Sequence, residues 1–363
     1  MPATYVLVGG GGVRGSFTAA CLGHLQSSRH PLAMANVIAG VSIGSIIGAC
    51  LATDSSVLDI LEQLKRTDVV AHHSTMTNMF RTLQIYRGKR QSLFSTDTIA
   101  EILSYSLAGK PVKCDMYTAV AGDAMKLVQE EFETTSGNAI PIPEVLASCA
   151  ILGAYPPIQL QKPGQPPRWY IDGGFSNAFP MKKIKEFMDS SDAEVLSLYA
   201  AKPWLARIPE IEFDEFSVRN TTALLLRRYW YSLSKLDHHQ IFKLVPIPLQ
   251  MIPDGIFAAI FTLNDQAWTV HKIITSKTTD YVRPAGRIKV VYFCAPTGEQ
   301  YLRYETMNLS QRHEEREQNM DLTIDFGEKA CLEMQEVYKI VNASFREAQV
   351  QLQSTPLSLS FRF

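Results

Sequence analysis

The chain has 363 residues, of which 46% are hydrophobic and 20% charged, a balance typical of a globular protein and not of a disordered one. Its 35 basic and 36 acidic residues leave a net charge of −1, which excludes a chain-wide field that recruits nucleic acid polymers or an anionic membrane, so any membrane contact must be local. The six cysteines and eight histidines show no disulfide or metal-binding spacing, and they indicate reduced, mostly buried thiols without a metal site.

The first elements alternate between strand and helix. A short apolar strand at 5–8 stops at four glycines and is followed by a helix at 16–26. A second strand at 37–40 leads through a tight turn to a helix that begins near residue 43. The alternation continues with helices at 53–66 (capped by Thr53 or Asp54), 95–107 and 142–152, and with strands at 116–123, 168–172, 194–200 and 286–296. Strands that alternate with helices predict an α/β fold with a mostly parallel sheet and helices on both faces.

Residues 201–285 differ from the rest of the chain, because they are rich in aromatic residues and proline and show a helical pattern at 221–239. A long amphipathic helix is predicted after them, at 322–352. We therefore predict one domain, 1–363, with its core at 4–200 and 286–345 and a helical cap or lid at 201–285.

Neither the N-terminus nor the most apolar stretch of the chain favours a membrane-spanning segment. The N-terminus lacks a basic start and a cleavage site, so it does not read as a signal peptide. The most apolar stretch, 244–263, contains three prolines, an aspartate and a glycine, whereas a spanning helix needs about 20 apolar residues without such interruptions. We expect a cytoplasmic protein that is peripheral to membranes.

The glycine run after the first strand has two candidate ligands. Gly10, Gly12 and Gly15 satisfy the GxGxxG pattern between a strand and a helix, which is the dinucleotide-binding context. That interpretation requires an acidic residue at the end of the second strand to hold a ribose, but no Asp or Glu precedes Asp54. No GK[ST] follows the glycines, so a phosphate loop is disfavoured as well. The alternative is that the run holds charge that develops during a reaction.

The second glycine turn carries a serine. The stretch GVSIG places Ser42 between Gly40 and Gly44 at a strand-to-helix junction, the context of a nucleophile elbow. Glycines remove side chains that would clash in so sharp a turn, and the helix that follows points its N-terminal amides at the serine. Since consecutive strands usually pair, the two glycine turns should lie side by side. Amides of the first turn would then face the hydroxyl and stabilise an oxyanion.

A serine hydroxyl needs a general base. The histidines that follow Ser42 lie in no recognisable motif. The better candidate is Asp172, which ends a strand in WYIDGG, where Gly173 and Gly174 let the backbone turn and approach closely. An aspartate can serve as the base if it lies within hydrogen-bond distance of the hydroxyl and is partly desolvated.

Together these motifs resemble those of the patatin-like phospholipase family. The family pattern is a GGGxRG loop, a GxSxG serine and an Asp-Gly-Gly or Asp-Gly-Ala aspartate. The flank before the aspartate, 147–180, also matches, although Leu152 stands where the family usually has proline. The matching residues here are Gly10, Gly11, Gly12, Val13, Arg14 and Gly15, then Gly40, Ser42 and Gly44, then Asp172, Gly173 and Gly174.

The resemblance implies a three-layer α/β/α sandwich and a lipid acyl hydrolase with a Ser-Asp dyad and no catalytic histidine. Ser42 would be the nucleophile and Asp172 the base, and the reaction would cleave fatty-acyl esters of phospholipids at a membrane surface through a covalent acyl-enzyme, without a cofactor. The oxyanion hole would consist of the backbone of Gly10, Gly11, Gly12, Val13 and Arg14, with Arg14 bracing the loop.

Two alternatives stay open at the level of sequence. The same hydrolase could act as a regulated membrane-degrading effector that is silent until a nucleotide or a host protein binds 201–285. The fold could also serve as a lipid-binding module without catalysis, although the intact motifs argue against it.

Overall fold

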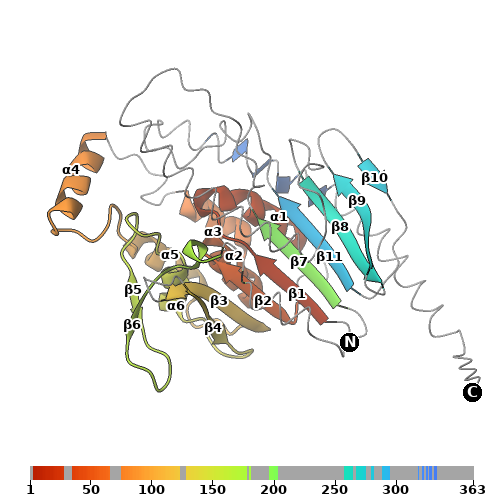
Figure 1. Ribbon diagram of the computed structural model, residues 1–363, viewed down its shortest axis with the longest axis horizontal. Helices are drawn as coiled ribbons and strands as arrows, with labels where there is room; N and C mark the ends of the chain where they lie inside the picture. Colours follow the sequence, from red (N-terminus) through yellow and green to blue (C-terminus); the bar gives the residue numbers. More distant parts are fainter. Residues whose placement is uncertain are drawn as a thin grey trace, which may run out of the picture.

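The computed structural model describes part of the chain (Figure 1). The described residues are 3–27, 35–65, 75–122, 128–177, 180, 196–202, 257–264, 267–274, 279–281, 288–294, 318, 321–322, 324–325, 327–328 and 331–332. The strands are β1 (Ala3–Val8), β2 (Val37–Val41), β3 (Asp115–Gly122), β4 (Val128–Thr134), β5 (Ile158–Leu160), β6 (Arg168–Asp172), β7 (Leu196–Lys202), β8 (Phe257–Asn264), β9 (Ala267–Ile274), β10 (Thr279–Tyr281) and β11 (Ile288–Cys294). The helices are α1 (Ser16–Ser27), α2 (Ile43–Thr53), α3 (Val57–Leu64), α4 (Thr75–Tyr86), α5 (Asp97–Leu107) and α6 (Ile142–Ser148), with short 3-10 turns η1 (Gly12–Gly15) and η3 (Gly173–Phe175).

All described strands belong to one 11-stranded sheet, in the order β10-β9-β8-β11-β7-β1-β2-β3-β6-β5, with β4 also paired to β3. The five central strands, from β11 to β3, run parallel, and the strands added beyond them on either side are antiparallel. The predicted α/β fold with a mostly parallel centre is confirmed. The antiparallel margins were not predicted, because strand direction depends on pairing between segments that the sequence pattern does not show.

The parallel pairing explains why the two glycine turns meet. Val8, the last residue of β1, pairs with Gly40 of β2, so both chains leave the sheet at the same level. The carboxyl ends of neighbouring parallel strands share one edge of the sheet, which is where α/β proteins place their ligands. Val6, Leu7 and Val8 are all fully buried, as expected of a central parallel strand with both faces covered.

Helix α2 lies at the centre of the packing. It contacts β1, β2 and β3, as well as α1, α5 and α6. Nearly all its residues are buried, because its sequence IGSIIGACLAT is apolar or small on every side. Phe17, Ile46 and Leu103 belong to the large core cluster between these helices and the sheet. A helix enclosed on all sides holds its first residue rigidly, and that residue follows Ser42.

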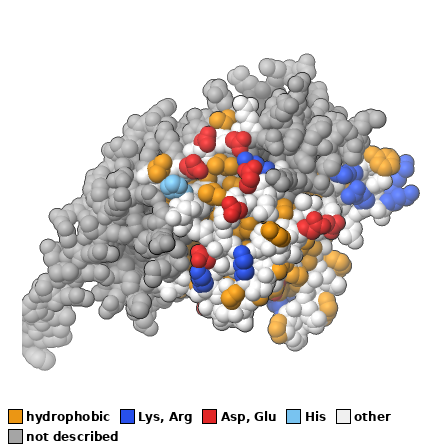
Figure 2. All heavy atoms as spheres, turned by 180° about the vertical axis from the view of Figure 1, so that it is seen from behind, with side chains coloured by type: hydrophobic (Ala, Val, Ile, Leu, Met, Phe, Trp, Pro, Cys, Tyr) orange, Lys and Arg blue, Asp and Glu red, His pale blue; other side chains and the backbone are white. Residues whose placement is uncertain are grey.

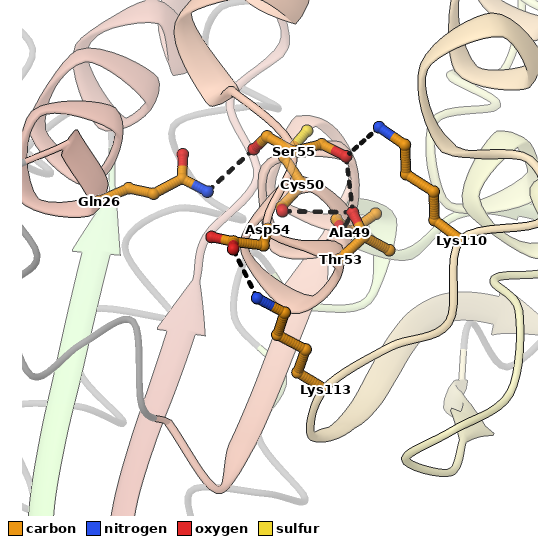
Figure 3. A network of polar contacts seen from close by, with 8 residues as sticks. All are labelled: Gln26, Ala49, Cys50, Thr53, Asp54, Ser55, Lys110 and Lys113. Carbon is orange, nitrogen blue, oxygen red and sulfur yellow. Dashed lines mark hydrogen bonds and ion pairs between the residues drawn. The ribbon is translucent and has the colours of Figure 1, made fainter.

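The far end of α2 is anchored by a polar network (Figure 3). Asp54 ends the helix in the left-handed conformation, at φ 56°, and its carboxylate pairs with Lys113 at 2.5 Å. The backbone amide of Lys113 donates to the carbonyl of Ala52 at 2.7 Å, and the ammonium of Lys110 donates to Ser55 Oγ at 3.0 Å. Two cations at a helix C-terminus stabilise its dipole. The end opposite Ser42 is therefore fixed.

The cap predicted for α3 was wrong. Ser56, not Thr53 or Asp54, accepts the helical amide of Asp59, at 3.1 Å. The hydroxyl of Thr53 donates instead to the carbonyl of Ala49 within α2. The sequence TDSS offers four capping residues in a row, so pattern alone could not choose among them.

The structure differs from the expected helical cap at 201–285 wherever that range is described. Residues 257–264, 267–274 and 279–281 are strands that extend the sheet beyond β11. Their sequences, such as FAAIFTLN, carry the aromatic and β-branched residues that favour strands. The helical pattern at 221–239 lies outside the described residues, and the domain boundaries stay a prediction.

The described part of the helix predicted at 322–352 is helical. It lies next to α1, where Cys21 Sγ donates a hydrogen bond to the carbonyl of Gly327 at 3.0 Å. The five cysteines with described side chains, Cys21, Cys50, Cys114, Cys149 and Cys331, are free and buried, as expected. Within the described part of the chain, no helix is both long and apolar enough to cross a bilayer.

Candidate active site

Ser42 occupies a strained turn between β2 and α2. Its backbone has φ 57° and ψ −130°, a conformation that residues with a side chain seldom adopt and that costs on the order of 1–3 kcal/mol. A Cβ atom on Gly40 would collide with the carbonyl of Gly44, and one on Gly44 would collide with the carbonyl of Val8. Both glycines of the GxSxG motif are therefore required by close backbone contacts, as the sequence predicts.

The hydroxyl of Ser42 and the carboxylate of Asp172 are in direct contact. Ser42 Oγ donates a hydrogen bond to Asp172 Oδ2 at 2.6 Å. The backbone amide of Gly174 donates to the other oxygen, Oδ1, at 2.7 Å. The amide of Asp172 itself donates to the carbonyl of Ala150 at 3.0 Å. Ser42 is 5% exposed and Asp172 is 2% exposed, so this pair is nearly shielded from water.

The register of β3 brings the two residues together. Strand β4 pairs along one edge of β3, from Met116 to Gly122. On the other edge β2 pairs with β3 as far as Ala119, where Val41 is its last residue, and β6 takes over at Val120, opposite Asp172. Strand β2 ends its pairing at Ala119 and β6 begins its pairing at Val120, the next residue on the same edge of β3. Ser42, which follows β2, and Asp172, which ends β6, are adjacent for that reason.

Gly173 and Gly174 have separate reasons to be glycine. A Cβ atom on Gly173 would collide with the carbonyl of Ala119, so a larger residue would push β6 away from β3. A Cβ atom on Gly174 would lie 2.9 Å from Asp172 Oδ1, the oxygen that the Gly174 amide binds. The Asp-Gly-Gly motif therefore fixes both the strand end and the carboxylate.

The environment raises the proton affinity of the carboxylate. Burial raises the pKa of Asp172 from its ordinary 3.8 to about 7, although the hydrogen bonds from Ser42 and Gly174 act in the opposite direction. A carboxylate with a pKa near neutrality can take a proton from a neighbouring hydroxyl and return it later. The geometry and the pKa of Asp172 both suit a general base.

Ser148, which ends α6, contacts the candidate site but was not predicted to do so. Its hydroxyl accepts hydrogen bonds from the amide of Ser42 at 2.8 Å and from Ser45 Oγ at 2.7 Å, and it donates to the carbonyl of Ala119 at 2.5 Å. The one hydroxyl proton of Ser148 is used in the hydrogen bond to the carbonyl of Ala119. Ser45 must therefore be the donor of the hydrogen bond between the two serines. Ser148 is part of the 147–180 flank, but a small polar residue at a helix end gives no signal of this role.

The glycine loop lies against the elbow. A Cβ atom on Gly10 would lie 3.2 Å from Ser42 Cβ, and one on Gly15 would collide with the side chain of Ile43. The amides of Gly10, Gly11 and Gly12 donate no hydrogen bond to any group in the described segments. Gly12 has φ 55°, which only glycine adopts freely. The loop therefore lies against the serine turn at Gly10, with three amides that no described group accepts.

The remaining loop residues are only partly described. Val13 and Arg14 belong to η1, so their backbone continues the turn. Their side chains lie outside the described residues, and the role expected of Arg14 as a brace stays a prediction. Among the residues that the structure describes, no three His, Cys, Asp or Glu side chains are grouped so that they could hold a metal ion.

A family model provides the comparison that decides the relationship. The model of the patatin-like phospholipases matches residues 6–183, which include the glycine loop, the serine turn and Asp172. Over these residues the chain belongs to the patatin-like phospholipase family. Patatin-like phospholipases are serine acyl-ester hydrolases, and the patatin-like region here contains every motif residue named above.

Several solved structures are similar to the chain at low identity. Human GIVD cytosolic phospholipase A2 has 9% identity and a TM-score of 0.44, over 95% of this chain and 60% of that one. The same enzyme with methyl gamma-linolenyl fluorophosphonate has 10% identity and a TM-score of 0.41, over 96% and 60%. VipD from Legionella pneumophila has 13% identity and a TM-score of 0.33, over 62% and 52%. The patatin-like chain thus spans between half and two thirds of the length of these proteins. No curated protein matches it in sequence.

Proposed function

We propose that the chain is a lipid acyl hydrolase that cleaves fatty-acyl esters of phospholipids through Ser42, Asp172 and a covalent acyl-enzyme. The observation that carries the proposal is the 2.6 Å hydrogen bond between Ser42 Oγ and a buried carboxylate, at a strained strand-to-helix turn. Membership of a serine acyl-ester hydrolase family supports the reaction class.

The first half of the reaction transfers the acyl group to the enzyme. Ser42 Oγ attacks the ester carbonyl while Asp172 Oδ2 takes its proton, so the nucleophile never has to exist as a free alkoxide. The carbonyl oxygen becomes negative, and the amides of the glycine loop at residues 10–12, which donate to no described group, stabilise it. The lysolipid alcohol then leaves with the proton that Asp172 held, and the acyl group stays on Ser42.

The second half releases the acid. A water molecule gives its proton to Asp172 and attacks the acyl carbonyl, and the same loop amides stabilise the second oxyanion. Ser42 leaves with the proton from Asp172, and a fatty acid departs. The amide of Ser42 donates to Ser148 and is not available to the oxyanion, so we assign that role to the amides of the glycine loop.

The experiment combines covalent labelling with turnover. A fluorophosphonate probe should label wild type at Ser42, and a fluorogenic fatty-acyl ester should be hydrolysed. Both signals should vanish in Ser42→Ala. Ser45→Ala is the matched control, because it removes a buried hydroxyl in α2, three residues after Ser42. This variant should still be labelled. Hydrolysis that persists in Ser42→Ala, or a labelled peptide without Ser42, would overturn the proposal.

Two finer questions stay within this proposal. We further propose that the enzyme acts at a membrane surface on lipid esters. The activator-dependent alternative concerns 201–285, of which 203–256 lies outside the described residues. Full activity of the purified chain without any addition would contradict it.

A further inference from the structure

Helix α4 is set apart from the rest of the described chain. It projects beyond the ends of α5 and the β5–β6 hairpin (orange in Figure 1), and it makes no extensive contact with another described element. Three large apolar side chains on it are exposed: Phe80 at 61%, Leu83 at 42% and Tyr86 at 91%. A spacing of three residues places them along one stripe of the helix.

The same segment is strongly basic. Residues 69–96 contain Arg81, Arg87, Lys89 and Arg90 and no Asp or Glu, so the segment carries 4 − 0 = +4 in a chain of net charge −1. None of the four forms an ion pair with a described carboxylate. Figure 2 shows Lys and Arg gathered with hydrophobic side chains on the projecting part of the molecule.

Arg81 differs from the other three cations, because part of its guanidinium is enclosed. The Nη1 atom of Arg81 is enclosed and has no partner among the described residues. Exposed aromatic rings are unfavourable in water, and the exposed cations Arg87 and Lys89 carry charge that no described carboxylate offsets. An anionic bilayer offers both what the rings need, an apolar layer under a polar one, and what the cations need, a negative surface.

The arm is rooted beside the dyad. After α4 the chain returns to the body at Leu93 and Phe94, whose amides donate to the carbonyls of Gly153 at 2.9 Å and Ala154 at 2.8 Å. Those acceptors follow closely after Ala150, whose carbonyl receives the amide of Asp172. Leu152, between them, is 58% exposed. The chain that follows α4 is therefore attached to the segment that holds the carboxylate of Asp172.

We propose that α4 and the basic residues directly after it, up to Arg90, form a docking arm for an anionic lipid surface. The arm brings the hydrolase of the previous section to its substrate, and in that respect this inference rests on the proposed function. The apolar stripe inserts among the headgroups, and the cations bind lipid phosphates and carboxylates. Neither attraction is strong alone, so the arm binds reversibly and selects negatively charged membranes.

The test measures partition into vesicles by co-sedimentation, in a Ser42→Ala background so that the lipid stays intact. Vesicles of phosphatidylcholine alone are compared with equal parts of phosphatidylcholine and phosphatidylserine. The mixed vesicles should bind the chain at least about 30-fold better, and Arg87→Gln with Lys89→Gln should remove about 30-fold of that binding. Phe80→Ser with Tyr86→Ser should weaken it about tenfold.

Matched controls lie elsewhere on the surface. Lys110→Gln with Lys113→Gln removes the same charge from the end of α2, and Tyr105→Ser removes an aromatic ring that is 88% exposed. Both controls should bind as the parent does. Equal binding of the parent to the two vesicle types, or equal binding of arm and control variants, would overturn the proposal.

A second measurement separates this inference from the proposed function. In the catalytically intact chain, the arm variants should hydrolyse a soluble short-chain ester at the parent rate, while their rate on mixed vesicles falls. Charge-dependent binding without any ester hydrolysis would support the docking role of the arm and contradict the proposed hydrolase function. Loss of the soluble activity in the arm variants would overturn the docking role, since the arm would then act on the site itself.

Discussion

Replacing Asp172 with asparagine should abolish activity and stabilise the fold in a pH-dependent way. Burial raises the pKa of Asp172 from 3.8 to about 7, so between these values the folded chain keeps a proton that the unfolded chain has lost. The folded state binds more protons, and its free energy of unfolding therefore falls as the pH rises through this window. Integration between pH 5 and pH 8 with the two pKa values gives a loss of about 2.5 kcal/mol for wild type.

Asparagine cannot ionise, so the variant escapes this loss. The difference in unfolding free energy between Asp172→Asn and wild type should grow by about 2–3 kcal/mol from pH 5 to pH 8. Comparing the change with pH, instead of the absolute values, cancels the altered hydrogen bond to Ser42. Without a base, kcat/KM for a soluble ester should fall by at least about 10³.

Urea denaturation of both proteins at the two pH values measures the effect, with the slope of each transition confirming that the same surface is exposed. Asp97→Asn removes an exposed carboxylate and is the matched control, whose difference should change by less than about 0.5 kcal/mol. A difference for Asp172→Asn that is constant with pH, or that shrinks as the pH rises, would refute the reasoning that burial governs this carboxyl.

Three further predictions follow from the same geometry. Since only ionised Asp172 can act as the base, and burial places its pKa at about 7, kcat/KM for a soluble ester should fall about tenfold per unit below that pH and level off above it, as a pH–rate profile would show. Ser148→Ala leaves the amide of Ser42 without its acceptor, so urea denaturation should show a loss of about 1–3 kcal/mol, and labelling by a fluorophosphonate should slow. Gly44→Ala should lower the free energy of unfolding, measured by urea denaturation, by more than about 3 kcal/mol, because its Cβ meets backbone carbonyls. Gly109→Ala, with open space around it, should cost about 1 kcal/mol in the same assay.

The sequence predicts the site well where chemistry and backbone geometry use the same residues. Gly40 and Gly44 were expected because a sharp turn excludes side chains, and the structure shows the backbone contacts that exclude them. Ser42 and Asp172 were paired on motif and order along the chain, and they are in contact. Glycine and proline restrict or permit particular backbone conformations, so motifs built on them predict local structure from the sequence alone.

What could not be predicted depends on contacts between distant segments. Ser148 acts through its neighbours Ser42 and Ser45, which are over 100 residues away in sequence, and a serine at a helix end has many ordinary roles. The strands at 257–274 were mistaken for part of a helical cap, because they are short apolar runs next to a segment rich in proline. For such runs, pairing partners decide between helix and strand, and periodicity does not.

The shared edge of β3 connects the strain at Ser42 with the buried charge at Asp172. Each feature is unfavourable alone: the turn costs on the order of 1–3 kcal/mol, and the desolvated carboxylate opposes folding above pH 7. Strands β2 and β6 use consecutive positions along one edge, so neither feature can relax without breaking ladder bonds to β3. Ser148 adds a hydrogen bond to that same strand, because its hydroxyl donates to the carbonyl of Ala119. The sheet thus supplies the stability that offsets both, and substitutions that loosen β3 should reduce activity before they unfold the chain.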